Sequence, residues 1–564
     1  MKHTFLALAV AGLFVTAVGA APKPNVLFIA VDDLKPNLGC YGDTAAKTPN
    51  IDRLAARGTL FERAYCMQAV CAPSRNAMLT GLRPQVLRIY DLGTNFRQSV
   101  PDVETLPQWF KEHGYKAEGM GKIYHVGHGN HEDPASWSVP HWQGKSVAYV
   151  LPENRDKMTR EGALFENKFG LKDLPKGAPM EAADVADDAY PDGQIANEAI
   201  QRLRAAKDKP GTPFFIAVGF LRPHLPFCAP KKYWDLHDPA KLPQPTTDEA
   251  PKGAPKFAPT TWGELRNYSD IPETGPLDAA KTRQLIHGYY AATSFTDAQV
   301  GRVMDELDHL GLAESTIIVL WGDHGWHLGD HGMWCKHTDY EQATHAPLII
   351  AAPGFQAGQR RKAITEFIDV YPTLCDLAGL EKPSHLQGAS LAALMKNESA
   401  TAKTAAFQVY PRGSKETGPL LGQAVRTDRW RYVEWQKADG SVAARELYDM
   451  QDDPGETVNV AEDPKQAETI QALSATVRKQ LAEPPPAGLK MLPMGKDAPA
   501  KPALDRAALF LKKDKNQDGK LTHEEFMADQ PDPPEAEKRW IKFDTDKNGE
   551  LSREEFISAG AVKK

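Results

Sequence analysis

Short apolar, β-branched runs alternate through the first two thirds of the chain with stretches whose apolar positions recur at helical spacing. The strand-like runs are residues 25–31, 116–120, 213–219, 316–321 and 347–351. Amphipathic helices are predicted over residues 50–58, 105–113, 192–206, 279–311 and 368–378. This alternation predicts an α/β domain with a large mixed, mostly parallel sheet flanked by helices on both faces.

The last third of the chain has a different pattern. Strand-like pieces at residues 422–427, 430–435 and 445–448 precede a helical pattern at 464–481, which predicts a smaller α+β subdomain. A Pro-, Ala- and Lys-rich stretch then has the composition of a linker. The predicted units are a signal peptide (1–21), a main domain (22–400), the subdomain (401–482), the linker (483–502) and an acidic module (503–564).

The N-terminus has the pattern of a secretory signal peptide. Lys2 precedes an apolar run over residues 5–18, and the small residues Gly19 and Ala20 predict cleavage after Ala20 or Ala21. The run is shorter than the roughly 20 apolar residues that a spanning helix needs, with an uncleaved anchor as the alternative. We therefore expect a periplasmic or secreted protein with no integral membrane segment after cleavage.

The composition argues against a disulfide-rich scaffold and against a nucleic-acid-binding protein. Six cysteines among 564 residues are too few for a disulfide scaffold, and Cys40, Cys66 and Cys375 are interpreted as small buried residues or a single bridge. The net charge of −7 includes no basic excess, so we expect no nucleic-acid partner.

Polar side chains follow four of the predicted strands, at the point where each strand ends. They are Asp32 and Asp33, Lys122 and His125, His224, and Asp323 and His324. Because ligands bind outside the carboxyl ends of the strands of an open parallel sheet, we expect these side chains to meet at one edge.

Three carboxylates from two strands favour a hard cation such as Ca²⁺ or Mg²⁺, which prefers oxygen ligands. Alone, the pair Asp32 and Asp33 would equally predict a helix cap or a solvated turn. The histidines at residues 324–331, and the spacing of His125, His128 and His131, leave Zn²⁺ as an alternative.

Cys71 precedes a predicted short helix, in which Pro73 suits the first turn and Gly81 marks the end. Position 71 therefore lies at a helix N-terminus, where oriented N–H groups attract an anion and activate a thiolate. An inert buried cysteine is the alternative for such a residue taken alone.

The acidic module contains two complete EF-hand loops. The first supplies Asp514, Asn516, Asp518, Lys520, Thr522 and Glu525, and the second Asp544, Asp546, Asn548, Glu550, Ser552 and Glu555. Lys520 and Glu550, at the seventh position, would contribute backbone carbonyls to bound Ca²⁺. We expect a stabilising or tethering role for this helical pair rather than a switch.

The motif Cys71-Ala72-Pro73-Ser74-Arg75 resembles the signature of type I sulfatases. The segments 32–36, 39–42, 48–52 and 322–326 are similar to the iduronate-2-sulfatase branch, and the resemblance spans residues 25–448. It implies an alkaline-phosphatase-like fold and a formylglycine made from Cys71 by a maturation enzyme. It also implies a Ca²⁺ site formed by Asp32, Asp33, residue 71, Asp323 and His324. His324 stands where many sulfatases have Asn, so its role as a ligand depends on this branch alone.

By the same resemblance, residue 71 is the nucleophile and Arg75 holds the formylglycine hydrate. Lys122, His125, His224 and Lys336 would grip the sulfate oxygens. Either His125 or His224 could protonate the departing sugar oxygen, because imidazole titrates near neutral pH, and the sequence leaves that choice open.

The expected function is hydrolysis of sulfate esters in sulfated polysaccharides or glycosaminoglycans. Residues 130–189 and 227–276 are predicted to shape the substrate pocket, with Trp137, Trp142 and Tyr149 as candidates for stacking on sugars. A phosphoester hydrolase of the same superfamily and a catalytically silent binder of sulfated glycans are the alternatives.

Overall fold

The computed structural model describes residues 23–144, 149–155, 158–167, 174–400, 403–494, 509–510, 513–516, 518–528 and 533–558. The predicted signal peptide lies outside these ranges. Within them, no helix combines the length and the apolar character that crossing a bilayer requires.

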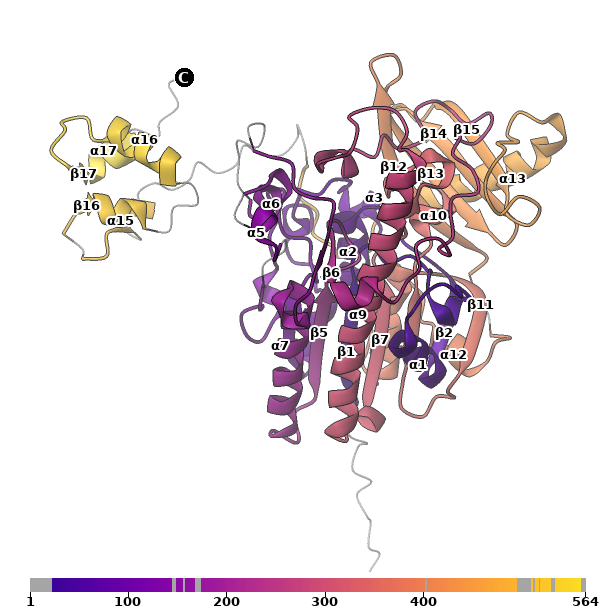
Figure 1. Ribbon diagram of the computed structural model, residues 1–564, viewed down its shortest axis with the longest axis horizontal. Coiled ribbons are helices and arrows are strands. Elements are labelled where there is room, and N and C mark those ends of the chain that lie inside the picture. The colour runs from indigo at the N-terminus through magenta and orange to yellow at the C-terminus, as the bar shows by residue number, and fades with distance from the viewer. Residues whose placement is uncertain are drawn as a thin grey trace, which may run out of the picture.

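A seven-stranded sheet forms the centre of the main domain (Figure 1). Its strands, in spatial order, are β11 (Gln359–Glu366), β2 (Thr59–Tyr65), β10 (Leu348–Ala351), β7 (Thr316–Gly322), β1 (Asn25–Val31), β5 (Phe214–Phe220) and β3 (Lys116–Gly121). β10 is antiparallel to both neighbours, whereas the other neighbouring strands are parallel. The mixed, mostly parallel sheet and the five predicted strands are confirmed.

Helices cover both faces of the sheet because alternate residues of its buried strands point to opposite sides. On one face, Leu27 and Ile29 of β1 share a hydrophobic cluster with α1 (Pro49–Arg57), α7 (Pro191–Lys207) and α9 (Ala279–His309). On the other, Val26 and Phe28 pack in a cluster with α2 (Cys71–Thr80), α4 (Leu106–Glu112) and α11 (Val370–Leu377). The five predicted helices and the helix after Cys71 are confirmed.

Shorter elements complete the main domain. They are α3 (Pro84–Leu87), α5 (Pro152–Arg155), α6 (Arg160–Phe165), β4 (Met180–Ala183), β6 (Phe227–Pro230), α8 (Lys231–Trp234), β8 (His327–Leu328), β9 (Trp334–Cys335), α10 (Glu341–Thr344) and α12 (Ala392–Lys396). Several of them interrupt the two long stretches that the sequence predicted as loops. All six cysteines are free thiols, so the alternative of a single bridge is wrong.

The C-terminal subdomain is an antiparallel sheet of four strands with one helix on it. The strands are β12 (Ala405–Ser414), β13 (Gly418–Thr427), β14 (Trp430–Gln436) and β15 (Val442–Asp449), and the helix is α13 (Ala467–Leu481). The chain then returns to the main domain, where the Leu492 amide donates to the Ser99 carbonyl at 2.7 Å. Leu489, Met491 and Met494 pack against the main core there.

The EF-hand region has its own core, built from Phe510, Leu521, Phe526, Ala536, Trp540, Phe543, Leu551 and Phe556. Its described elements include α15 (His523–Met527), α16 (Pro533–Phe543), α17 (Arg553–Ser558), and the paired strands β16 (Lys520–Thr522) and β17 (Glu550–Ser552). Gly519 and Gly549 each have φ of +81°, the left-handed turn that the sixth loop position requires. Ligand oxygens of Asp544, Asp546 and Glu555 lie within 4.8 Å of one another.

A buried ion-pair network joins the C-terminal sheet to the main domain. Arg431 of β14 is fully buried, and its guanidinium lies 2.5 Å from Glu341 Oε2 and 2.7 Å from Glu456 Oε1. Its Nη1 donates to the Asp339 carbonyl at 2.6 Å. Arg431 thus pairs with one glutamate of the main domain and one of the C-terminal subdomain.

We predict that Arg431→Ala lowers the free energy of unfolding by about 3–5 kcal/mol, because the buried Glu456 loses its ion-pair partner and Glu341 keeps only its pair with Arg426. Urea denaturation followed by tryptophan fluorescence measures the change. Arg429→Ala is the matched control, since its pair with Asp449 is half exposed and should hardly shift the midpoint. Equal effects of the two variants would contradict the assignment.

Candidate active site

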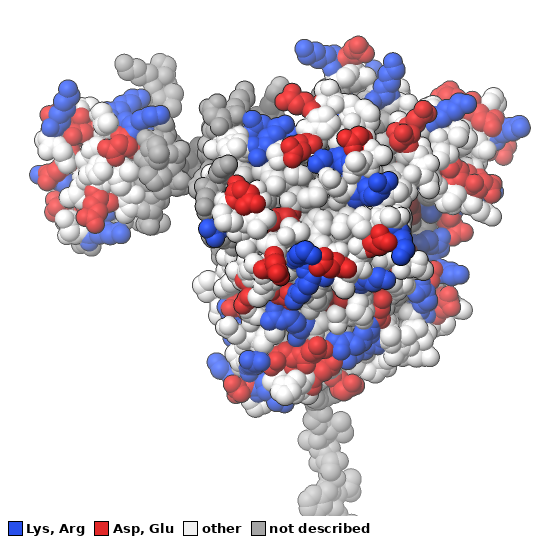
Figure 2. Space-filling view, viewed as in Figure 1, with Lys and Arg blue, Asp and Glu red and all other residues white. Residues whose placement is uncertain are grey.

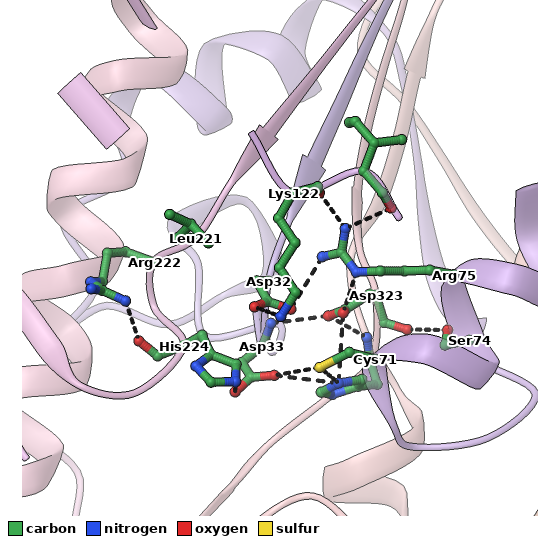
Figure 3. Close-up of polar contacts among 12 residues, drawn as sticks. Asp32, Asp33, Cys71, Ser74, Arg75, Lys122, Leu221, Arg222, His224 and Asp323 are labelled. Atoms are coloured by element: carbon green, nitrogen blue, oxygen red, sulfur yellow. Dashed lines mark hydrogen bonds and ion pairs between the residues drawn. The ribbon is translucent and has the colours of Figure 1, made fainter. Parts of the chain in front are cut away.

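The carboxyl ends of β7, β1, β5 and β3 lie side by side, since these strands are neighbours in the sheet. Asp323 and His324 follow β7, Asp32 and Asp33 follow β1, and His224 lies in the turn after β5. Lys122 and His125 follow β3. The structure brings these side chains together at one edge of the sheet, as the strand-end pattern predicted. Figure 3 shows Asp32, Asp33, Lys122, His224 and Asp323 there.

Arg75 is the fully buried centre of this cluster. From the second turn of α2, its Nε donates to Asp323 Oδ2 at 2.8 Å and its Nη2 to Asp32 Oδ1 at 3.1 Å. Its Nη1 donates to the Ile123 carbonyl at 3.1 Å and also to the Lys122 carbonyl. One guanidinium therefore fixes the ends of three strands relative to α2.

Lys122 and Lys336 supply two further buried cations. Lys122 Nζ forms an ion pair with Asp32 Oδ2, and Lys336 Nζ lies 3.0 Å from both carboxylate oxygens of Asp33. Cys335 and His337 flank Lys336 with φ of +69° and +67°, in the left-handed region that non-glycine residues rarely adopt. The backbone is strained at Cys335 and His337, on either side of Lys336, whose side chain points into the cluster.

Burial and neighbouring charges give the two adjacent carboxylates, Asp32 and Asp33, different pKa values. Burial would raise the pKa of Asp32, but the charges of Lys122, His224 and Arg75 outweigh it and hold the pKa well below its usual range. Burial raises the pKa of Asp33 to about 7 despite the opposing charges of Lys336 and His224. Ionising a buried carboxyl group costs free energy. A bound cation offsets that cost because it stabilises the carboxylate anion.

The donor set fits a hard divalent cation. Ligand atoms of Cys71, Asp323 and His324 lie within 4.8 Å of one another, and Asp32 and Asp33 form a second such group with Cys71 and His224. His324 Nδ1 lies 2.9 Å from the Gly325 carbonyl, which places the ring proton there and leaves the Nε2 lone pair toward Asp33. Three carboxylates with one imidazole favour Ca²⁺ or Mg²⁺ over Zn²⁺.

The histidines of the alternative zinc site do not all converge on one point. His125 Nε2 lies 3.2 Å from His128 Nδ1, but His131 is exposed and joins no group of possible metal ligands among the described residues. In the stretch after His324, His327 Nε2 is hydrogen-bonded to Thr338 Oγ1 at 2.8 Å. His327 supports the fold beside the cluster, whereas His125 and His128 line the cavity next to Cys71.

Cys71 is the first residue of α2 and its side chain is buried. Its Sγ lies 3.3 Å from His324 Nε2 and 3.9 Å from Asp33 Oδ1, and it contributes to the wall of a cavity of about 210 Å³. The side chain therefore occupies the point where the helix N-terminus, the carboxylate cluster and the cavity meet.

The two candidate acid groups, His224 and His125, have different surroundings. His224 Nδ1 lies 2.6 Å from the Leu225 carbonyl, and its Nε2 lies 3.0 Å from Glu264 Oε1. Burial would lower the pKa of His224, but Asp33 and Asp32 outweigh it and raise the pKa well above its usual range. For His125, burial together with the charge of Lys122 holds the pKa well below its usual range.

Both long stretches that the sequence predicted to shape a pocket line this cavity. Glu161, Leu164 and Phe165 come from the first, and Glu264 and Asn267 from the second. No motif surrounds Glu161, Glu264 or His337, so their sequence context does not single them out. Glu161 and Glu264 lie in the two stretches predicted to shape the pocket, whereas His337 lies outside both.

The three aromatic residues predicted to stack on sugars are mostly committed to the fold. Trp137 packs in the main core, and the Tyr149 hydroxyl donates to the Ala178 carbonyl at 2.8 Å within another cluster. Trp142 packs against the cluster under α7 and α9. Their large apolar surfaces fill gaps under the loops, so the prediction of stacking is wrong for Trp137 and Tyr149.

Outside this edge of the sheet, charges of both signs are interspersed. Figure 2 shows Lys and Arg next to Asp and Glu over most of the described surface in that view.

Comparison with known proteins identifies two family matches in the catalytic part of the chain. The model of the family described as Sulfatase matches residues 24–380. The model described as N-sulphoglucosamine sulphohydrolase, C-terminal, matches residues 329–483. The EF hand model matches residues 506–528 and 541–558.

Human iduronate 2-sulfatase is 33% identical over 524 residues, which cover 80% of this chain and 93% of that protein. A protein named sulfatase from Formosa agariphila is 33% identical over 469 residues, covering 81% of this chain and 87% of its own length. A protein solved with its substrate, D-glucosamine-2-N,6-O-disulfate, superposes with a TM-score of 0.64 at 23% identity, covering 81% of this chain and 97% of its own.

The sulfatase model spans more than half of the chain, and the relatives at 33% identity cover four fifths of it. The site described above lies inside the matched region. The fold is shared with the solved structure, so the expectation of an alkaline-phosphatase-like architecture is confirmed. The chain belongs to the sulfatase family of sulfuric ester hydrolases, with an EF-hand region at its C-terminus.

Proposed function

We propose that this protein is an exported, iduronate-2-sulfatase-like sulfatase that hydrolyses sulfate esters of sugars in polysaccharides or glycosaminoglycans. The observation that carries the proposal is the position of Cys71. Within the motif at residues 71–75, its Sγ lies beside His324 and Asp33 and faces a cavity bordered by buried cations. Human iduronate 2-sulfatase and the glucosamine-disulfate complex support a sulfated sugar as the substrate class.

Formylglycine made from Cys71 would supply an aldehyde hydrate whose hydroxyl attacks the sulfur of the ester. Cys71 is 1% exposed in the folded chain, so a maturation enzyme would have to reach it before the domain closes. The predicted signal peptide agrees with modification during export. Arg75 would orient the modified side chain while it holds Asp32 and Asp323.

Asp32, Asp33, Asp323 and His324 would hold one Ca²⁺, together with residue 71. When bound, Ca²⁺ would lower the pKa of the hydrate and polarise the sulfate group. The four side chains are buried and already converge, so they would bind the ion with little rearrangement.

Lys122 and Lys336 would bind the non-bridging sulfate oxygens. Both ammonium groups are nearly buried and lie on the two sides of the carboxylate cluster, against Asp32 and Asp33. A sulfuryl group gains negative charge on these oxygens in the transition state, and cations fixed in advance stabilise that charge without reorganisation. His125, next to Lys122 and without a charge at neutral pH, would contribute hydrogen bonding rather than charge.

His224 is the better candidate for the general acid. Both of its ring nitrogens face acceptors, the Leu225 carbonyl and the Glu264 carboxylate, which requires a proton on each nitrogen. His125 Nδ1 has no hydrogen-bond partner, and its Nε2 faces another imidazole. A doubly protonated His224 can give its Nε2 proton to the departing sugar oxygen.

The first test is the state of position 71 in protein from a host that modifies it. We expect mass spectrometry of the tryptic peptide 64–75 to show an aldehyde, which a hydrazide reagent traps. Cys71→Ala should reduce sulfate release from sulfated monosaccharides at least about 10³-fold, because the nucleophile is lost. Phosphate esters turned over faster than sulfate esters would favour a phosphoester hydrolase. An intact thiol with retained glycan binding would favour a silent binder.

The general-acid assignment predicts a dependence on the leaving group. His224→Ala should slow hydrolysis of alkyl sugar sulfates about 10²–10⁴-fold but affect an activated aryl sulfate much less, because a phenolate leaves without a proton. Steady-state kcat on the two substrate types measures this. His125→Ala is the control and should slow both substrates by similar factors. The reverse pattern would assign the proton to His125.

We propose that Ca²⁺ binds at the carboxylate cluster and at the EF-hand loops. Removing it should therefore have two separable effects. Removing Ca²⁺ with EGTA should abolish sulfate release, and adding Ca²⁺ should restore it. The double variant Glu525→Gln, Glu555→Gln should lose the EF-hand ions and keep the activity, because neither loop contributes to the catalytic cluster. Calorimetric titration counts the remaining ions. Full activity after exhaustive chelation would contradict the proposed role of the metal.

A further inference from the structure

A carboxylate lies inside the cationic part of the catalytic cavity. Glu264 Oε1 is 3.0 Å from His224 Nε2, and its Oε2 is 2.9 Å from Lys336 Nζ and 3.5 Å from His337 Nε2. The side chain lines the cavity and is 14% exposed. A negative charge in a site that binds anions weakens the binding of those anions. Its presence there therefore calls for a specific role.

The position of Glu264 is set by a well-packed segment. Glu264 precedes a short 3₁₀ helix, Leu265–Asn267, and Trp262, Leu265 and Tyr268 are buried in one hydrophobic cluster. The Arg266 guanidinium lies 3.5 Å from the centre of the Trp262 ring. These contacts hold the backbone on both sides of Glu264, so its carboxylate is directed at the two cations by the fold.

Glu264 contacts the same groups that the proposed function gives to the substrate. His224 Nε2 would donate to the departing oxygen and Lys336 Nζ to a sulfate oxygen, yet in this structure both donate to Glu264. Burial would raise the pKa of Glu264, but the charges of Lys336 and His224 outweigh it and hold the pKa well below its usual range. The carboxylate is therefore an anion that takes the place of two sulfate oxygens.

We propose that Glu264 is an internal counter-ion of the catalytic cavity, which orients His224 and Lys336 in the free enzyme and is exchanged for the sulfate group on binding. This inference rests on the proposed function, because it names the exchange partner as a sulfate oxygen. Glu264 acts through His224 and Lys336 and is a positioning residue. The negative charge of Glu264 weakens the binding of every sulfate, including the inorganic product. Glu264 therefore favours product release.

The test compares inorganic sulfate binding by the full chain and by Glu264→Gln, both made in a host that modifies Cys71. Removing the competing charge should tighten the inhibition constant of inorganic sulfate about tenfold and lower KM for the ester. Calorimetry with sodium sulfate gives the same quantity without turnover. Glu264→Asp restores the charge and should return the constant most of the way to the wild-type value.

A second carboxylate in the same cavity provides the matched control. Glu161 lines the cavity and is buried, but it makes no ion pair with Lys336 or His224. Glu161→Gln should therefore change the sulfate constant much less than Glu264→Gln. A change of equal size would show a general effect of charge in the cavity and overturn the assignment to Glu264.

The outcomes separate this inference from the proposed function. Wild-type protein that hydrolyses sulfate esters, with sulfate binding unchanged or weakened in Glu264→Gln, overturns the counter-ion role alone. Wild-type protein that neither hydrolyses nor binds sulfate overturns the proposed function and this inference with it. Should Glu264→Gln unfold, Glu264→Asp that binds sulfate as tightly as was expected of Glu264→Gln would also contradict the proposal.

Discussion

A single buried guanidinium, that of Arg75, determines how the catalytic edge of the sheet is assembled. Charges with no solvent around them must be paired, and Arg75 pairs with carboxylates that follow two different strands while it donates to backbone carbonyls after a third. The same helix, α2, begins with Cys71. The distance from Cys71 to the carboxylates is therefore fixed by one ion-pair network rather than by loop packing. The lysines that pair with these carboxylates are held at a fixed distance from Cys71 in turn.

Much of this arrangement could be predicted from the sequence because it follows from the topology of parallel strands. Once the strands ending at Val31, Trp321 and Gly219 were recognised from their apolar runs, the polar residues after them had to meet at one edge. β2 and β11 were missed because charged residues interrupt their patterns. Glu62 and Arg63 lie in β2, which is only partly buried near one side of the sheet. Burial on both faces gives a strand a continuous apolar signal, and these strands lack it.

The outer part of the site could not be predicted in this way. Glu264 reaches His224 and Lys336 from a segment whose course depends on tertiary packing of Trp262 and Tyr268, and no local period encodes that contact. The same reason explains the error over Trp137 and Tyr149. An aromatic residue in an irregular stretch can face a ligand or fill space beneath the loop, and the sequence pattern is the same for both. The difference is decided by neighbours that are distant in the chain.

The C-terminal subdomain contacts one wall of the candidate active site. His337, next to Lys336, is hydrogen-bonded to two residues of β12. Its Nδ1 lies 2.8 Å from the Tyr410 hydroxyl, and its carbonyl accepts a hydrogen bond from Arg412. Arg431 on β14 neutralises Glu341, a few residues further along the same segment. The left-handed backbone at Cys335 and His337 stores strain that only such contacts can hold. Without β12 and β14, the segment that follows Lys336 would lose these hydrogen bonds and its ion pair with Arg431.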